Sequence, residues 1–410
     1  MIKSIFIRRV ITLLSGTVAA QMLPILFAPV LTRMYTPEHF GVLGIYIATT
    51  SIFGVIASLR FELAIVQCST KGDALKLTNL SILISVFISL FLLLLIYVFE
   101  DTIQQLFKGE IDGWVFLIPL SVLSIGVFQS LLYLNNRQAK FSLIAKSKIV
   151  QSLVNILFCL GFYFIDSNPT GLILGHILGQ ITLAIMLARS WGFGTILKIN
   201  RFSLNRYYFL LKKNKRFPLI SAPGALLDTA SLQAPVLFIN QYYSVLLAGF
   251  YNFIYRIMGA PFALTSSAIA QVFLQKVATE RGVALSQIKS ILKVSLIPSI
   301  LFVAVINLFG EQLFYVIFGK SWAEAGVYAG IIVFSIVIRF TVSPLSMVMA
   351  LKRNLKLGFC WQLSYFISIL LVIYFMVEKP FKDFLYVFVT VDVVLYLVYF
   401  ALIIFAAKRV

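Results

Sequence analysis

The stretch QMLPILFAPVLTRMY, residues 21–35, decides the fold, because a second stretch half a chain later matches it. ASLQAPVLFINQYY covers residues 230–243, and Ala28–Leu31 recurs there as Ala234–Leu237 at an offset of 206 residues. The tripeptide Gln-Leu-Phe at 105–107 recurs at 312–314, an offset of 207. Half of the 410-residue chain is 205 residues. The sequence therefore predicts an internal duplication.

Both matching stretches lie in long apolar runs, which indicate a membrane protein. Hydrophobic residues make up 60% of the chain and charged residues 12%, and the mean hydropathy is +0.98. An ordinary soluble domain does not have this composition, and about 20 apolar residues suffice to span a bilayer. About twelve such runs occur, at residues 10–31, 42–66, 78–99, 114–134, 149–165, 170–188, 217–240, 246–275, 290–309, 327–350, 356–377 and 384–406.

The basic residues predict the orientation of these spans. With twelve spans, the two termini and the even-numbered connectors share one side, and they hold 25 of the 34 Lys and Arg residues, whereas the odd-numbered connectors hold 5. Basic residues collect in cytoplasmic loops. We therefore expect a multi-pass membrane protein with both termini in the cytoplasm. The net charge of +19 then needs no nucleic acid to explain it.

The duplication and the spans together predict an all-α fold of two six-helix bundles. Equal orientation of the two halves implies a pseudo-twofold axis along the membrane normal, with a central cavity between the halves. The predicted bundles are residues 1–188 and 217–410, and the basic segment 189–216 connects them. Within this segment, residues 201–217 form either an interfacial helix, with Phe202, Tyr208 and Leu211 toward lipid, or a plain positive-inside loop.

Cysteine, histidine and catalytic motifs give no sign of an enzyme. Cys68, Cys159 and Cys360 are scattered without a CxxC motif, and His39 and His176 are isolated, so we expect neither a metal site nor a cofactor. The chain contains no Walker loop, no GxSxG and no HExxH motif. We expect a protein that is not an enzyme.

Polar and small residues follow single faces of several predicted spans, at steps of three or four residues. Small residues allow helices to pack closely, so helix packing with an Arg–Asp pair is one interpretation of these faces. The alternative is a wet cavity, because packing does not require arginines inside the membrane. The faces are Thr17, Gln21, Pro24, Ala28 and Thr32; Ser221, Gly224, Asp228, Ser231 and Pro235; Gly249, Asn252, Arg256, Ala260, Ala263, Ser267 and Gln271; Ser335, Arg339, Ser343, Ser346 and Ala350; and Asp392, Tyr396 and Tyr399.

The second predicted span carries two charges, Arg60 and Glu62. On a continuous helix they point about 200° apart, which predicts that they do not form an ion pair. Glu62 continues a seam of small residues, Ser51, Gly54 and Ser58, which suits packing against a neighbouring helix. We therefore assign Arg60 to the cavity, and Glu62 to helix pairing or to a coupling ion.

The stretch from Pro29 to Val66 resembles polysaccharide biosynthesis proteins of the O-antigen flippase type, in the multidrug/oligosaccharidyl-lipid/polysaccharide exporter superfamily. Its motifs are the turn TRMYTPEHFG at 32–41 and the tripeptide Arg60-Phe61-Glu62, and the segments 249–264 and 318–326 also look similar to this family. The resemblance implies two six-helix bundles around a cation-lined cavity that opens to one side at a time. It implies lipopolysaccharide O-antigen or other surface polysaccharide synthesis as the pathway, and the bacterial cytoplasmic (inner) membrane as the location.

The expected substrate is an undecaprenyl-pyrophosphate-linked oligosaccharide, which moves from the cytoplasmic to the outer leaflet. Guanidinium groups bind phosphate through paired hydrogen bonds, so Arg60, Arg256 and Arg339 are the candidate cavity cations. Candidate hydrogen-bond partners for sugar hydroxyls are Gln21, Asn252, Gln271, Tyr396 and Tyr399. Glu62, Asp228 and Asp392 are the carboxylates for a coupling proton or sodium ion, or for helix pairing. We expect a monomer in contact with membrane lipids, with a polysaccharide polymerase and a chain-length protein as partners.

Three other function classes fit the sequence less well. A cation-coupled multidrug exporter of the same superfamily needs an acidic cavity, whereas the intramembrane arginines here at least equal the acids. An O-antigen polymerase should have a large external loop, and the external connectors are short. A scaffold protein leaves the arginine-bearing faces unexplained.

Overall fold

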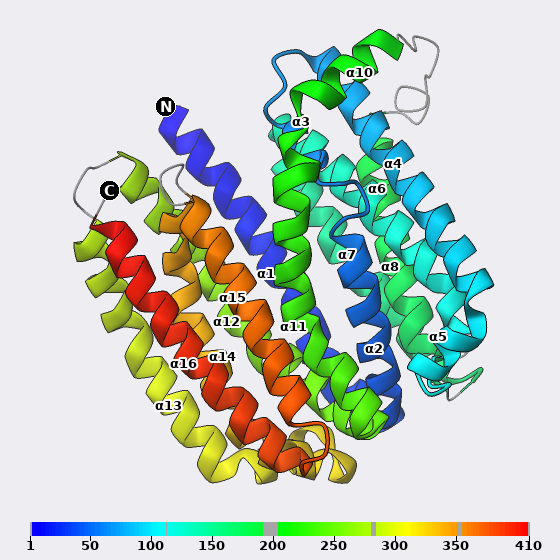
Figure 1. Cartoon of the computed structure of the whole chain (residues 1–410), viewed down its shortest axis with the longest axis vertical. Coiled ribbons are helices and arrows are strands. Elements are labelled where there is room, and N and C mark those ends of the chain that lie inside the picture. Colours follow the sequence, from blue (N-terminus) through cyan, green and yellow to red (C-terminus); the bar gives the residue numbers. More distant parts are fainter. Residues whose placement is uncertain are drawn as a thin grey trace. The chain divides into compact units, whose positions relative to one another are not determined.

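The computed structural model of the chain is described for residues 2–111, 113–166, 168–191, 204–279, 284–350 and 355–408, and these residues are helical without any strand (Figure 1). Apolar runs must bond their backbone internally within a bilayer, which a helix does. Eleven of the described helices are long and apolar enough to span a membrane. They match eleven of the twelve predicted runs; the exception is the run at 42–66. The all-helical, multi-span fold is thus confirmed.

The chain divides into two compact units, which together contain the whole of it. Unit 1 comprises Met1–Phe27 and Val42–Gln233, and unit 2 comprises Ala28–Gly41 and Ala234–Val410. The elements of unit 1 are α1 (Ile2–Met34) up to Phe27, α2 (Pro37–Gly54) from Val42, α3 (Glu62–Ile65), α4 (Lys71–Val98), α5 (Glu100–Leu106), η1 (Trp114–Leu117), α6 (Ile118–Arg137), α7 (Phe141–Tyr163), α8 (Thr170–Arg189), α10 (Leu204–Lys213), the π-helical η2 (Phe217–Ser221) and α11 (Ala222–Tyr242) up to Gln233.

Unit 2 contains the remaining helices and is rich in aromatic contacts. Its elements are the ends of α1 and α11, the start of α2, and α12 (Val245–Thr279), α13 (Ala284–Phe318), η3 (Lys320–Trp322), α14 (Ala323–Val342), η4 (Ser343–Ala350), α15 (Leu355–Phe375) and α16 (Phe381–Ala407). Trp322 is fully buried, and its ring lies 4.2 Å from that of Phe253 and 5.2 Å from that of Phe40.

The boundaries of the two units differ from those of the two predicted bundles, residues 1–188 and 217–410. Residues 28–41 belong to unit 2 because their backbone is held there: the indole Nε1 of Trp322 donates to the carbonyl of Thr32 at 3.2 Å. The Nη1 of Arg33 donates to the carbonyl of Ile317 at 2.9 Å, at the end of α13. Residues 222–233 belong to unit 1. Two of the three changes of unit, before Ala28 and before Ala234, fall at the two copies of the repeated Ala-Pro-Val-Leu tetrapeptide, and the third follows Gly41.

Close backbone contact also holds residues 28–41 in unit 2. A Cβ on Gly249 would lie 2.0 Å from the carbonyl oxygen of Pro37, and a Cβ on Gly41 would lie 2.1 Å from that of Val245. Real Cβ atoms do not approach backbone so closely, so only glycine fits at both positions. The TRMYTPEHFG turn is therefore a packing motif that joins the starts of α2 and α12.

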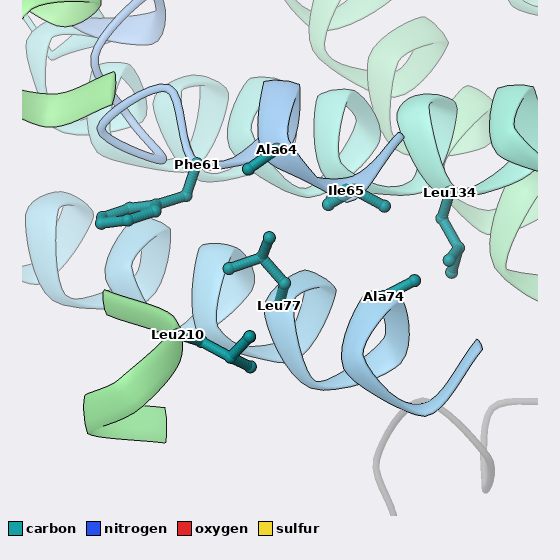
Figure 2. Packing of buried hydrophobic residues seen from close by; sticks show 7 residues of the cluster. All are labelled: Phe61, Ala64, Ile65, Ala74, Leu77, Leu134 and Leu210. Carbon is teal, nitrogen blue, oxygen red and sulfur yellow. The ribbon is translucent and has the colours of Figure 1, made fainter. Parts of the chain in front are cut away.

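One hydrophobic cluster of unit 1 lies where α3, α4, α6 and α10 meet. Figure 2 shows its buried side chains, among which Leu77 of α4 faces Ile65 of α3 and Leu210 comes from α10. Helix α10 is amphipathic, and Arg206 ties it to Asp73 of α4 by two hydrogen bonds of 2.9 and 2.6 Å. A short helix thus covers the start of α4.

Candidate functional site

A buried ion pair between Arg339 of α14 and Asp392 of α16 is the centre of the polar residues in unit 2. The Nε and Nη2 of Arg339 donate to the two carboxylate oxygens at 2.9 and 3.0 Å. The hydroxyl of Tyr365 accepts from Nη2 at 2.7 Å and donates to Asp392 at 2.8 Å. Ser335 also donates to Asp392, and its Oγ lies 2.8 Å from the hydroxyl of Tyr255. Four helices, α12, α14, α15 and α16, therefore meet at one carboxylate.

Aromatic rings surround the guanidinium of Arg339. Its carbon lies 5.4 Å from the ring centre of Tyr396 and 5.9 Å from those of Tyr255 and Tyr365. The side chain of Asp392 is fully buried, whereas that of Arg339 is 16% exposed. Withdrawing two charges from water is costly, and only near-ideal geometry compensates that cost. The bidentate pair meets this condition, and it leaves one edge of the arginine accessible.

The accessible edge of Arg339 borders a hollow of about 310 Å³ in unit 2. Tyr255, Gly259 and Ala263 of α12 line one side, and Phe340 lies on the Arg339 side. The lining residues include one cation and no carboxylate among the residues that the structure describes. Such a hollow suits an anionic group better than an organic cation.

The prediction that Arg60 and Glu62 do not pair is wrong. The Nη1 of Arg60 lies 3.6 Å from Oε1 of the fully buried Glu62, in unit 1. The predicted continuous helix is absent: α2 ends at Gly54, and Leu59 and Arg60 have φ values of 50° and 63°. This left-handed turn replaces the 100° step per residue on which the prediction relied. The Arg60 side chain is 24% exposed, so its assignment to a cavity stays a prediction.

The predicted packing role of Glu62 agrees with the contacts around it. Ser58 donates a hydrogen bond to Glu62. A Cβ on Gly54 would lie 2.7 Å from the side chain of Ile125 on α6, so this seam packs tightly. The carboxylate of Glu62 is therefore buried beside the packed contact between the end of α2 and α6.

The long polar face predicted on α12 divides into a packed end and an open middle. Gly249 touches the backbone of Pro37, as described above, and so lies in a helix contact. The Nδ2 of Asn252 is buried without a hydrogen-bond partner among the described residues. Arg256, one turn further on, is half-buried. The side chain of Gln271 lies outside the described residues.

The remaining predicted residues fall into both units. Gln21 of α1 and Asp228 of α11 are exposed residues of unit 1. Tyr396 lies over Arg339, but Tyr399 is buried and stacks on Trp361 at 4.3 Å with an interplanar angle of 6°. The structure thus brings Arg339, Asp392 and Tyr396 together, and it gives Tyr399 a packing contact rather than an open face.

Lys148 is a further cation of interest that the sequence analysis did not name as a candidate. The predicted span begins at residue 149, but α7 already begins at Phe141 and therefore contains Lys148. Its Nζ donates to the hydroxyl of Thr17 on α1 at 3.4 Å, and Ser152, one turn further, donates to the carbonyl of Ala20 at 2.7 Å. The spacing of four residues between Lys148 and Ser152 is the signal that could have placed both on one face.

Comparison with known proteins identifies the family and the fold. The profile of a family described as "Polysaccharide biosynthesis protein" matches residues 30–327, most of the chain. None of the curated proteins matches. Among solved structures, the chain is similar to the lipid II flippase MurJ in an inward closed conformation, with a TM-score of 0.74 and 14% identity over 98% of this chain and 87% of that one.

Two transporter structures share the fold as well. One is a multidrug resistance MATE family transporter of the MOP superfamily in an inward-facing conformation, with a TM-score of 0.65 and 14% identity over 97% of this chain and 94% of that one. The other is a mutant of the Vibrio cholerae MATE transporter VcmN, with a TM-score of 0.63 and 10% identity over 98% of this chain and 95% of that one. At such identities the likeness is one of fold.

Proposed function

The chain belongs to the polysaccharide biosynthesis protein family, and from this premise we propose that it is a flippase for a lipid-linked oligosaccharide. The substrate class is an oligosaccharide on undecaprenyl pyrophosphate, carried from the cytoplasmic to the outer leaflet by alternating access. The protein performs no covalent chemistry. O-antigen or another surface polysaccharide is the product that its glycan enters, in a bacterial cytoplasmic membrane, with a polymerase and a chain-length protein acting afterwards.

The observation that carries this proposal is the arginine beside the hollow in unit 2. A pyrophosphate cannot cross hydrocarbon unaided, because burying an unpaired charge costs tens of kcal/mol by simple Born estimates. Arg339 supplies a planar pair of donors, which matches the geometry of phosphate oxygens. Both donors are now directed to Asp392. A phosphate in the hollow would compete with Asp392 for the same guanidinium.

This competition supplies a route for ion coupling. If the phosphate takes the donors of Arg339, Asp392 is left as a buried charge without its partner, which is strongly unfavourable. A proton or a sodium ion at Asp392 removes that penalty. Substrate binding and ion binding at this carboxylate would then favour each other. We propose Asp392 as the coupling carboxylate, ahead of Glu62 and Asp228.

A cation-coupled multidrug exporter is the second candidate, because solved MATE transporters share the fold. The hollow beside Arg339 does not favour the exporter, because its described lining residues include a cation and no carboxylate. Asp392 neutralises Arg339, but the hollow offers an organic cation no carboxylate among its described lining residues. The flippase proposal therefore remains first.

The test is deletion of the gene in the organism that encodes it, followed by complementation. We expect lipid-linked repeat units to accumulate with their glycan on the cytoplasmic side, accessible to a glycosidase only after the membrane is opened. Arg339→Gln should restore no surface glycan, and Arg339→Lys should restore part, because an ammonium lacks the planar fork. Asp383→Asn, an exposed carboxylate on the same helix as Asp392, is the control that should restore it fully. Normal glycan together with drug hypersensitivity in the deletion strain would establish the exporter instead.

A further inference from the structure

A second hollow in unit 2 is larger than the one beside Arg339 and contains none of the predicted site residues. It has a volume of about 610 Å³ and lies between α13, α14 and α16. We call it the outer groove and define it by Glu311 of α13, Gly330 and Phe334 of α14, and Lys382 and Val394 of α16. Gly310 and Gly326 bring α13 and α14 together, since a Cβ on Gly326 would lie 2.4 Å from the carbonyl oxygen of Gly310.

The two ends of the outer groove differ in polarity. Lys382, at the second position of α16, and Glu311, seven residues before the end of α13, are exposed charged residues at one end. Val394 and Phe334 line the other end and are 52% and 47% exposed. In a helix bundle that spans a membrane, apolar side chains with this much exposed surface face the hydrocarbon of the lipid.

The length of the outer groove corresponds to one leaflet. Lys382 and Val394 are twelve residues apart on one helix, which is about 18 Å at 1.5 Å per residue. Half of a hydrocarbon core of about 30 Å is about 15 Å. Helix α13 ends and α16 begins on the same side of unit 2 (Figure 1), next to connectors that the basic residues predict to be external. The charged residues lie toward this side, Lys382 at the start of α16 and Glu311 about two turns before the end of α13. The outer groove therefore runs from the outer interface to mid-membrane.

We propose that the outer groove binds a single outer-leaflet phospholipid whose headgroup carries both a phosphate and a primary ammonium, as in phosphatidylethanolamine. Lys382 is the partner of the phosphate and Glu311 that of the ammonium, while an acyl chain lies along Phe334 and Val394. One cation and one carboxylate at the same end match a zwitterion in charge. An anionic headgroup would meet the carboxylate, and a quaternary ammonium has no N–H to donate to it. The site is independent of the transported substrate.

Native mass spectrometry of the purified, delipidated full chain tests this site. Titration with phosphatidylethanolamine, phosphatidylcholine and phosphatidylglycerol should show one tight site with about tenfold preference for phosphatidylethanolamine, the scale of one charged hydrogen bond. Glu311→Gln should remove this preference but keep binding, and Lys382→Gln should weaken all three lipids. Thr390→Trp, which places a large ring in the groove from an exposed lining position, should abolish the tight site.

The matched control is Lys379→Gln, an exposed cation of the neighbouring connector that does not line the outer groove. It should bind the three lipids as the unaltered protein does. Equal binding of all three lipids by the unaltered protein, or an unchanged preference in Glu311→Gln, would overturn the proposal. The proposal would also be overturned if the unaltered protein formed a dimer and Thr390→Trp made it monomeric. A second copy of the chain, and not a lipid, would then occupy the outer groove.

Discussion

At the scale of single residues, the Arg339–Asp392 pair and the Arg60–Glu62 pair differ in how far the sequence predicts them. Arg339 and Asp392 lie on polar faces of regular helices, and an Arg–Asp pair was one interpretation of those faces. Arg60 and Glu62 were expected apart, because neither Gly nor Pro marks the turn at which Leu59 and Arg60 take left-handed backbone. A left-handed backbone at residues other than glycine is strained, and the packing around it keeps it in place. A single sequence does not show that packing.

The Arg60–Glu62 pair makes a prediction for stability. Arg60→Ala leaves Glu62 buried without a cation, and we expect the free energy of unfolding to fall by about 1–3 kcal/mol, less than the 3–5 kcal/mol of a fully buried pair because Arg60 is partly exposed. Glu62→Gln removes the need for the cation. The double variant should therefore be more stable than the sum of the two single effects implies, by about 1–2 kcal/mol. Unfolding of the four proteins in detergent, followed by tryptophan fluorescence, measures this coupling, and strictly additive effects would show that the two charges act separately.

At the scale of elements, the spans were predictable and the contacts of the connector were not. Of the two interpretations of 201–217, an interfacial helix or a plain loop, a helix forms at Leu204–Lys213, and Tyr208 is exposed as the helix interpretation predicts. Leu211, which was predicted to face lipid, packs instead against the cluster of Leu77 and Leu210, and Phe202 lies outside the described residues. Amphipathicity predicts that a helix has an apolar face, but whether lipid or protein covers it depends on tertiary packing.

The Arg206–Asp73 link makes a prediction for the docking of α10. Cys68 packs in the same cluster as Leu210, and burial raises the pKa of its thiol. In a chain with Cys159 and Cys360 replaced by serine, maleimide should therefore label Cys68 slowly at pH 7 and faster at pH 9. Arg206→Ala removes an exposed ion pair, and exposed pairs are weak, so the labelling rate at pH 7 should rise only modestly, up to about fivefold.

The control for this prediction is Lys212→Ala, which removes an exposed cation from the same helix but leaves the link to Asp73 intact. Its labelling rate should equal that of the parent chain. If Arg206→Ala labels no faster than this control, the ion pair does not hold α10 in place.

At the scale of the whole molecule, the two compact units of the structure differ in extent from the two halves that the repeat predicts. Sequence order alone assigns residues 28–41 to the first half, whereas the contacts of Trp322 and Arg33 assign them to unit 2. A segment so far from its partners in sequence cannot be located by periodicity. Three of the four segments that resemble the polysaccharide biosynthesis family, at 32–41, 249–264 and 318–326, meet in this one place, whereas Arg60-Phe61-Glu62 lies in unit 1. The likeness of these three segments to the family is therefore explained by packing of the fold rather than by recognition of a glycan.

Unit 2 should consequently depend on a segment from the start of the chain. We expect the fragment 204–410, expressed alone, to be degraded rapidly, because Trp322 and Gly249 then lack residues 28–41. Co-expression with the fragment 1–203 should lengthen its half-life at least threefold in a pulse-chase experiment. Gly41→Ala in the first fragment should abolish this rescue, since the added Cβ would lie 2.1 Å from the carbonyl oxygen of Val245. Gly72→Ala, whose Cβ would meet nothing within 4 Å, should rescue fully. A fragment 204–410 that is equally long-lived alone would show that unit 2 folds without residues 28–41.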